Sequence, residues 1–226
     1  DQDAGMKLHG RVTRSLPQKS MRFYARGEYG AKLFDYPLFA TRPIEAYNHF
    51  LLRSSGQDWY STYLRDALFA SLVSELQCAV QAYRPCMVFL NGNYWGMQNM
   101  RERVDNDFIA GHYNVSPDNI DLLEENALPK QGSSKAYHEL VDTLAAMDMS
   151  DEKAYAFANS HIDMENFTDY MIAQIYVSTG DWPQYNQRYW RERTAQGRWR
   201  WILTDVDMGL GMYDDTLACR KDVLAI

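Results

Sequence analysis

Alternating polar and apolar residues mark the beginning of the chain as a pair of strands. Residues 6–10 and 19–26 alternate in this way on either side of the turn-forming Ser15-Leu16-Pro17. A period of two lines the two faces of a β-sheet, whereas a period near 3.6 lines one face of a helix. We therefore predict an N-terminal antiparallel sheet that begins with these two strands.

A four-residue spacing replaces the alternation over residues 61–77. The large apolar residues of this stretch are Leu64, Leu68, Leu72 and Leu76, with Phe69 and Val73 beside them. Residues four apart lie on the same side of an α-helix. The pattern predicts a helix whose leucine stripe is buried in the core.

The middle of the chain combines a hairpin with helices. Asn91-Gly92 stands between the apolar runs 87–90 and 94–100, and this dipeptide favours a tight turn with positive φ angles. The helical pattern returns over residues 136–147, 152–159 and 164–177, the last with Asp163 as a candidate N-cap. We expect a β-hairpin followed by three helices.

A second hairpin is predicted near the end of the chain. Its strands cover residues 187–191 and 198–203, and the later strand directs Trp199, Trp201 and Leu203 to one face. Asp205 follows where this strand ends. A sheet, several helices and a late hairpin that brings acidic residues to a strand end indicate an α+β fold.

The composition supports a globular chain without a membrane span. Its 226 residues, 46% of them hydrophobic, suffice for one large domain or two small lobes. No apolar run approaches the roughly 18 residues that cross a bilayer, and residues 1–5 have no signal-peptide character. The net charge of −7 argues against sequence-independent binding of nucleic acid or anionic membranes, because both need a dense basic patch.

Cysteine and histidine residues argue against several enzyme classes. Cys78, Cys86 and Cys219 form no C-x-x-C pair, so we interpret them as buried thiols, although a Cys78–Cys86 disulfide remains open. The five histidines lack the spacing of metalloproteases and deaminases, and there is no G-x-S-x-G motif. Glycoside hydrolysis remains open, because the separation of two carboxylates depends on the fold.

The candidate chemistry lies in two segments, 180–186 and 204–209. The first holds Asp181 and Asn186 in a D-x-x-x-x-N arrangement, and the second holds Asp205 and Asp207 after an apolar strand. Phosphoryl transfer needs an acid that orients the attacking hydroxyl and hard oxygen ligands for a divalent ion. A D-x-x-x-x-N pair alone is common in loops, but two like charges at i and i+2 repel each other unless a cation lies between them.

Together with other motifs, these segments resemble the CotH kinase family, whose atypical kinases phosphorylate Ser or Thr of protein partners. The matching segments are Lys19-Ser20-Met21-Arg22, residues 51–59, Tyr83-Arg84-Pro85, residues 91–96, 101–105, 181–186 and 201–209. The resemblance implies an atypical protein-kinase-like α+β fold. It also implies a single domain over residues 1–226, with two sub-lobes that meet near residue 104, and we expect the chain to be a fragment of a longer protein.

The resemblance also implies roles for individual residues. Asp181 matches the catalytic acid, and Asn186, Asp205 and Asp207 match ligands of Mg²⁺ or Mn²⁺. The remaining matches concern the ATP phosphates: Lys19 would face them, Arg22 would be a further contact, and Glu102 would orient Lys19 through an ion pair. The expected acceptor is a Ser or Thr hydroxyl of a protein, and the expected location is outside the cytoplasm or at a cell or spore surface.

One departure and two rival functions accompany this reading. Residues 9–15 replace the Arg-Gly-Asn-Ser-Ser-like segment of the family, which weakens the case for nucleotide affinity. An Asp-x-Asp pair at a strand end also binds the diphosphate of nucleotide sugars in metal-dependent glycosyltransferases. Aromatic residues make up 14% of the chain, and those in or near turns, Tyr60, Tyr94, Trp95 and Trp182, fit a non-catalytic binding or coat-scaffold module.

Overall fold

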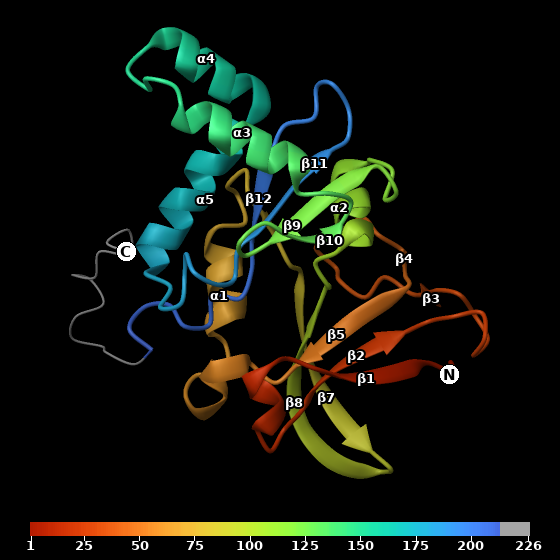
Figure 1. The fold of residues 1–226 in the computed structure, drawn as a ribbon. Coiled ribbons are helices and arrows are strands. Elements are labelled where there is room, and N and C mark those ends of the chain that lie inside the picture. Colours follow the sequence, from red (N-terminus) through yellow and green to blue (C-terminus); the bar gives the residue numbers. More distant parts are fainter. Residues whose placement is uncertain (213–226) are drawn as a thin grey trace. The chain divides into compact units, whose positions relative to one another are not determined.

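A computed structural model describes residues 1–212 of the chain (Figure 1). The chain divides into two compact units. The first unit comprises residues 1–68 and 81–104, and the second comprises residues 69–80 and those from 105 onward. The chain passes from the first unit to the second within helix α1 (Arg65–Leu72), between Leu68 and Phe69.

The first unit is built on a five-stranded antiparallel sheet with the strand order β1-β2-β5-β8-β7. Its strands are β1 (Gly5–His9), β2 (Ser20–Tyr24), β5 (His49–Arg53), β7 (Tyr83–Leu90) and β8 (Asn93–Arg101). Leu8 lies opposite Met21 in the β1–β2 register, which confirms the predicted N-terminal strands. The short strands β3 (Phe34–Asp35) and β4 (Ala46–Tyr47) pair with each other, and the 3₁₀ helices η1 (Val12–Ser15) and η2 (Gly56–Tyr60) complete the unit.

The Asn91-Gly92 turn between β7 and β8 is confirmed. Asn91 has a φ angle of 51° and Gly92 one of 79°, so both lie in the left-handed region that the sequence favours. The pairing shifts between Val88 and Phe89: Phe89 lies opposite Tyr94 but Val88 lies opposite Gly96. Trp95 is therefore the extra residue of a β-bulge.

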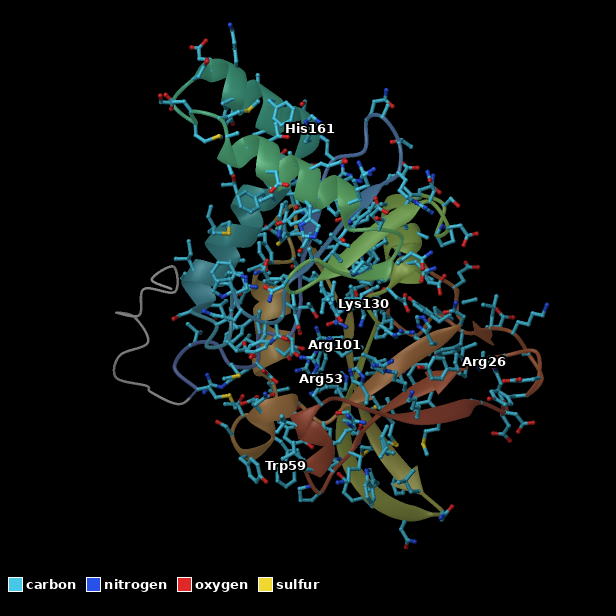
Figure 2. All side chains as sticks on the ribbon, in the orientation of Figure 1. Arg26, Arg53, Trp59, Arg101, Lys130 and His161 are labelled. Atoms are coloured by element: carbon cyan, nitrogen blue, oxygen red, sulfur yellow. The ribbon has the colours of Figure 1, made fainter. Side chains whose placement is uncertain are left out.

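A cluster of ion pairs joins the neighbouring strands β5 and β8 of the first sheet to Asp66. The side chain of Arg101 on β8 is buried, and its Nη1 contacts Oδ2 of Asp66 at the start of α1. Arg53 on β5 reaches the same Oδ2 atom over 3.4 Å, and the two arginines lie side by side in Figure 2. Removing the carboxylate or an arginine from such a cluster leaves a buried charge without its partner. We therefore infer that these residues stabilise the fold.

The second unit has a five-stranded sheet with the strand order β10-β9-β11-β12-β6. Its strands are β6 (Ala79–Val80), β9 (Ile120–Glu124), β10 (Leu128–Gln131), β11 (Arg188–Glu192) and β12 (Arg200–Leu203), all antiparallel except β12 with β6. Its helices are α2 (Asn106–Tyr113), α3 (Lys135–Ala145), α4 (Glu152–His161) and α5 (Met164–Val177). The three predicted helices and the late hairpin are confirmed.

Helices cover both faces of the second sheet. Trp199, Trp201 and Leu203 share one core cluster with residues of α3, α4 and α5, as the alternation in this strand predicts. On the opposite face, the ring of Trp190 lies 4.8 Å from that of Tyr113 on α2. The sheet is thus the middle layer of three. No described helix is long and apolar enough to cross a membrane.

One prediction for the helices is confirmed in position but not in its side-chain contact, and another is corrected in part. Asp163 lies at the N-cap position of α5, but its carboxylate binds Arg198 and Arg200 instead of a helix N–H group. Three leucines of the predicted stripe, Leu64, Leu68 and Leu72, are exposed, with relative accessibilities of 45%, 52% and 61%. The fourth, Leu76, is half-buried and packs against the core. The core instead receives Phe69 and Val73. A four-residue spacing shows that leucines share a face, but not that this face meets the core.

The cysteines within the described residues are free thiols. Cys78 is buried and Cys86 is half-buried, so the Cys78–Cys86 disulfide is not formed. Burial raises the pKa of Cys78 to about 11, which keeps its thiol protonated and unreactive at neutral pH. Cys219 lies outside the described residues.

Candidate functional site

The loop that carries Asp181 is anchored to the C-terminal end of α5. Ser178 ends this helix in the left-handed conformation, with a φ angle of 53°. The hydroxyl of the fully buried Thr179 donates to Oε1 of Gln174 over 2.8 Å. Trp182 Nε1 donates to the hydroxyl of Tyr170 over 2.8 Å. Side chains on both sides of Asp181 therefore hold the loop against the helix.

Tyr170 and Gln174 form the buried part of this anchor. Gln174 Nε2 donates to the Tyr170 hydroxyl over 3.2 Å, so that this oxygen accepts two hydrogen bonds. Burial raises the pKa of Tyr170 well above its usual range, and the hydroxyl stays protonated at neutral pH. Sequence reasoning did not select Tyr170 and Gln174, because a Tyr and a Gln four residues apart on a helix form no recognisable motif.

The segment with Asp205 and Asp207 runs beside this loop. Gly180 N donates to Met208 O over 3.1 Å, and Leu210 N donates to Val177 O over 2.6 Å. Val206 between the two acids is buried in the core of the second unit. Backbone hydrogen bonds and one apolar anchor thus bring together two segments that are separated by the β11–β12 hairpin.

Asn186 links the predicted acids. Its Nδ2 atom donates to Oδ2 of Asp181 over 2.7 Å and to the backbone oxygen of Asp205 over 3.4 Å. Both Asn186 and Asp205 have left-handed backbones, with φ angles of 59° and 58°, which Asn and Asp tolerate better than most residues. The structure therefore brings Asp181, Asn186 and Asp205 together.

The donor atoms at this place fit a hard divalent cation. Asp205 is half-buried and offers carboxylate oxygens, while the half-buried Asp181 carboxylate lies beside it as the candidate base. Because the Asn186 nitrogen is turned to Asp181 and Asp205, its amide oxygen is left for another ligand. Such oxygen atoms are the ligands that Mg²⁺ and Mn²⁺ prefer. Asp207, the other predicted ligand, has a relative accessibility of only 1%.

Gly209 is required where the two segments approach each other. A Cβ atom at this position would collide with the Val177 side chain and lie 3.0 Å from the Val177 carbonyl oxygen. We expect Gly209→Ala to destabilise the chain by about 1–3 kcal/mol, because backbone in contact with backbone cannot give way cheaply. The free energy of unfolding in urea measures this loss.

Gly180→Ala is the matched control for that measurement. Its Cβ would have no neighbour closer than the Met208 carbonyl oxygen, at 3.3 Å. We expect a loss below about 1 kcal/mol for this variant. Equal urea midpoints for Gly209→Ala and the unsubstituted chain would show that residues 205–210 are not packed tightly against Val177.

The predicted phosphate-binding residues belong to the first unit and have other partners. Lys19 Nζ donates to the backbone oxygens of Arg14, over 2.8 Å, and Leu16, over 2.6 Å. Oε2 of the buried Glu102 accepts from Ala82 N over 2.8 Å and lies 3.5 Å from Arg42 Nε. The expected Lys19–Glu102 ion pair is therefore not formed.

Arg22 and Asp58 complete the predicted motifs of the first unit. Arg22 Nε donates to His9 Nδ1 over 2.8 Å. The fully buried Asp58 accepts hydrogen bonds from the backbone and side chains of Thr62 and Arg65, at 2.7 to 3.2 Å. The carboxylate of Asp58 thus shapes the turn after η2, which gives Asp58, in the matching segment 51–59, a role in folding.

Comparison with known proteins identifies the family of the chain. No curated protein matches the chain. The family described as CotH kinase protein matches residues 6–224, which is nearly the whole length and includes the segments of Asp181, Asn186 and Asp205. The chain therefore belongs to the CotH kinase family.

Proposed function

We propose that the chain is a metal-dependent ATP phosphotransferase that phosphorylates Ser or Thr residues of a protein partner. Membership of the CotH kinase family indicates a kinase-like phosphotransferase. The observation that supports the finer proposal is the pair of hydrogen bonds from Asn186, one to the Asp181 carboxylate and one to the Asp205 backbone. These contacts join a candidate base and candidate metal ligands in one cluster.

The proposed roles follow from the chemistry of each side chain. Asp181 accepts or orients the proton of the attacking hydroxyl, and its carboxylate is held in position by Asn186. Asn186 and Asp205 would hold Mg²⁺ or Mn²⁺, with Asp207 proposed as a further ligand. When bound, the ion neutralises charge on the ATP phosphates. The protein contributes positioning, since little covalent chemistry is required of it.

Lys19 and Arg22 are proposed as phosphate contacts of the first unit. For Lys19 this role requires its ammonium to exchange two backbone oxygens for phosphate oxygens. Such an exchange is favourable when a charged acceptor replaces neutral ones.

We also propose that residues 1–226 act as one domain with two sub-lobes that meet near residue 104. We further propose that the protein works outside the cytoplasm or at a cell or spore surface.

Thermal unfolding with different nucleotides tests this function. We expect Mg-ATP or Mn-ATP, at roughly 100-fold above its Kd, to raise the Tm by about 5–10 °C, and ATP with EDTA to raise it far less. Incubation with ATP and casein should then yield phosphoserine or phosphothreonine, detected by mass spectrometry. Stabilisation by a UDP-sugar alone would favour the glycosyltransferase alternative instead.

A further inference from the structure

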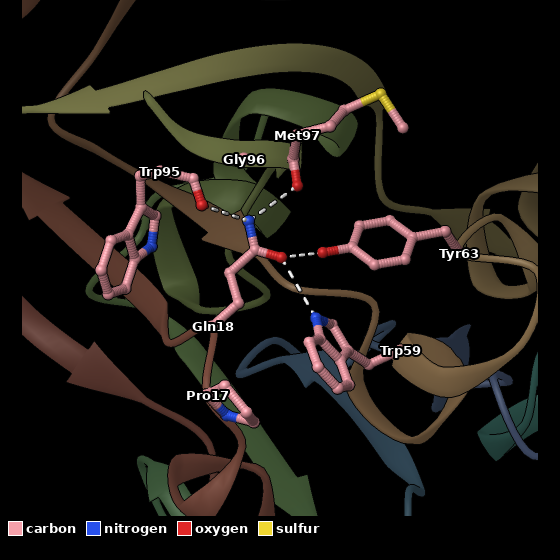
Figure 3. Close-up of a pocket in the computed structure, with 7 residues that line it drawn as sticks. All are labelled: Pro17, Gln18, Trp59, Tyr63, Trp95, Gly96 and Met97. Atoms are coloured by element: carbon pink, nitrogen blue, oxygen red, sulfur yellow. Dashed lines mark hydrogen bonds between the residues drawn. The ribbon is translucent and has the colours of Figure 1, made fainter. Parts of the chain in front are cut away.

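An aromatic pocket in the first unit has no part in the proposed phosphoryl transfer (Figure 3). It has a volume of about 460 Å³. Its lining residues are Pro17, Gln18, Trp59, Tyr63, Trp95, Gly96 and Met97. None of them carries a charge, so the pocket offers neither a phosphate group nor a metal ion a favourable partner.

The carboxamide of Gln18 holds the aromatic walls in place. Its Oε1 atom accepts from Trp59 Nε1 over 3.2 Å and from the hydroxyl of Tyr63. Its Nε2 atom donates to the backbone oxygens of Met97, over 3.0 Å, and Trp95, over 3.4 Å. Figure 3 shows these bonds converging on one side chain. These bonds satisfy the Gln18 carboxamide, Trp59 Nε1 and the Tyr63 hydroxyl, and leave ring surfaces for a ligand.

Gly96 and the bulge beside it make room for this arrangement. Gly96 has a φ angle of 125°, and a Cβ atom there would overlap Nε2 of Gln18. The bulge of β8 places Trp95 outside the regular pairing, and its side chain keeps a relative accessibility of 38%. Gly96 and the β8 bulge thus hold the Trp95 indole beside the buried carboxamide of Gln18. This arrangement depends on specific backbone features, unlike an isolated exposed aromatic side chain.

The hydrogen-bonding groups of the pocket indicate which ligand it accepts. The Gln18 oxygen already accepts two hydrogen bonds, and the nearby Trp95 and Met97 carbonyls are engaged. The indole N–H of Trp95 has no acceptor among the described residues. A sugar would bring several hydroxyl donors to a pocket with few open acceptors, and each unsatisfied donor costs about 1–3 kcal/mol.

Proline matches these groups. It has a compact apolar ring and no backbone N–H, so it brings no donor that the pocket must satisfy. The carbonyl group before it is an acceptor for the one open donor, Trp95 Nε1. Proline-rich segments are also extended before they bind, which lowers the entropic cost of binding.

We propose that this pocket binds a proline-containing extended segment of a protein partner. The proline ring lies against the indoles of Trp59 and Trp95, and the preceding carbonyl accepts from Trp95 Nε1. Phe89 and Tyr94, which lie on the same hairpin as Trp95, contact each other with ring centroids 5.5 Å apart and are exposed, so the hairpin offers further apolar surface. None of the residues that line this pocket has a role in the proposed phosphoryl transfer.

Fluorescence anisotropy with the full chain tests the proposal without ATP. The probe is a fluorescein-labelled polyproline peptide of about ten residues, which is mostly in the polyproline II conformation. We expect saturable binding that Trp95→Ala weakens about tenfold or more, as for a central aromatic residue. Trp95→Phe keeps an aromatic ring but removes the N–H donor, and we expect a smaller loss of about threefold to tenfold.

Met87→Ala is the matched control. Met87 lies on the same hairpin, is 71% accessible and does not line the pocket, so its substitution should change the Kd by less than about twofold. Circular dichroism establishes that each variant is folded. Absence of saturable binding, equal binding by Trp95→Ala, or preferential binding of chitohexaose would overturn the assignment, and none of these results bears on the phosphotransferase reaction.

Discussion

Asp181→Asn is expected to lower phosphoryl transfer by about 10²- to 10⁴-fold, the usual contribution of a positioned general base. The substitution keeps the size of the side chain and an oxygen that accepts from Asn186 Nδ2. The local structure and the affinity for Mg-ATP should therefore change little, because only the basic carboxylate is lost. Single-turnover transfer from radiolabelled ATP to casein separates this chemical step from binding.

Asp142→Asn is the control for this experiment. Asp142 is an exposed carboxylate on α3 of the second unit, and its removal changes the net charge of the chain by the same amount. We expect transfer within about twofold of the unsubstituted chain, as for most surface substitutions. If Asp181→Asn and Asp142→Asn transfer phosphate equally well, Asp181 has no role in the reaction.

Asp205→Asn is expected to weaken binding of Mn-ATP by at least about tenfold, because a neutral amide replaces a charged ligand of a hard cation. Asn is the appropriate replacement, since the φ angle of 58° at this position disfavours Ala. Isothermal titration calorimetry in Mn²⁺ gives the affinity of each protein.

The same titration in EDTA provides the reference. Without a divalent ion, the unsubstituted chain and Asp205→Asn should bind ATP with similar, weak affinity, because the substitution acts through the ion. An affinity for Mn-ATP that is unchanged in Asp205→Asn would exclude Asp205 as a ligand. A loss that persists in EDTA would instead indicate a direct or structural effect of the substitution.

Short-range chemistry is sufficient to predict most of the regular elements. The Asn91-Gly92 turn follows from the positive φ angles that these two residues tolerate, and helix α5 follows from its own apolar spacing. Among the elements that were not predicted are the strands β5, β9 and β10 and the helix α2. β9 is buried at all five positions, so it lacks the alternation that reveals a half-exposed strand.

Predictions that depend on a distant partner were less successful. The leucine stripe of α1 was assigned to the wrong face, because the side of a helix that meets the core is decided by what packs against it. The Lys19–Glu102 ion pair fails for a related reason. Backbone oxygens of Arg14 and Leu16 accept from Lys19, and Arg42 pairs with Glu102. The sequence does not show that these partners lie closer.

The sequence by itself determined the order of the motifs, the two hairpins and the helices α3, α4 and α5, because these depend on residues that are close along the chain. Only the tertiary structure decided that Asn186 contacts both Asp181 and Asp205, and that Gln18 organises an aromatic pocket. Both arrangements join residues from separate segments. Their geometry results from packing and hydrogen bonds across the fold, such as Leu210 to Val177, which no local pattern encodes.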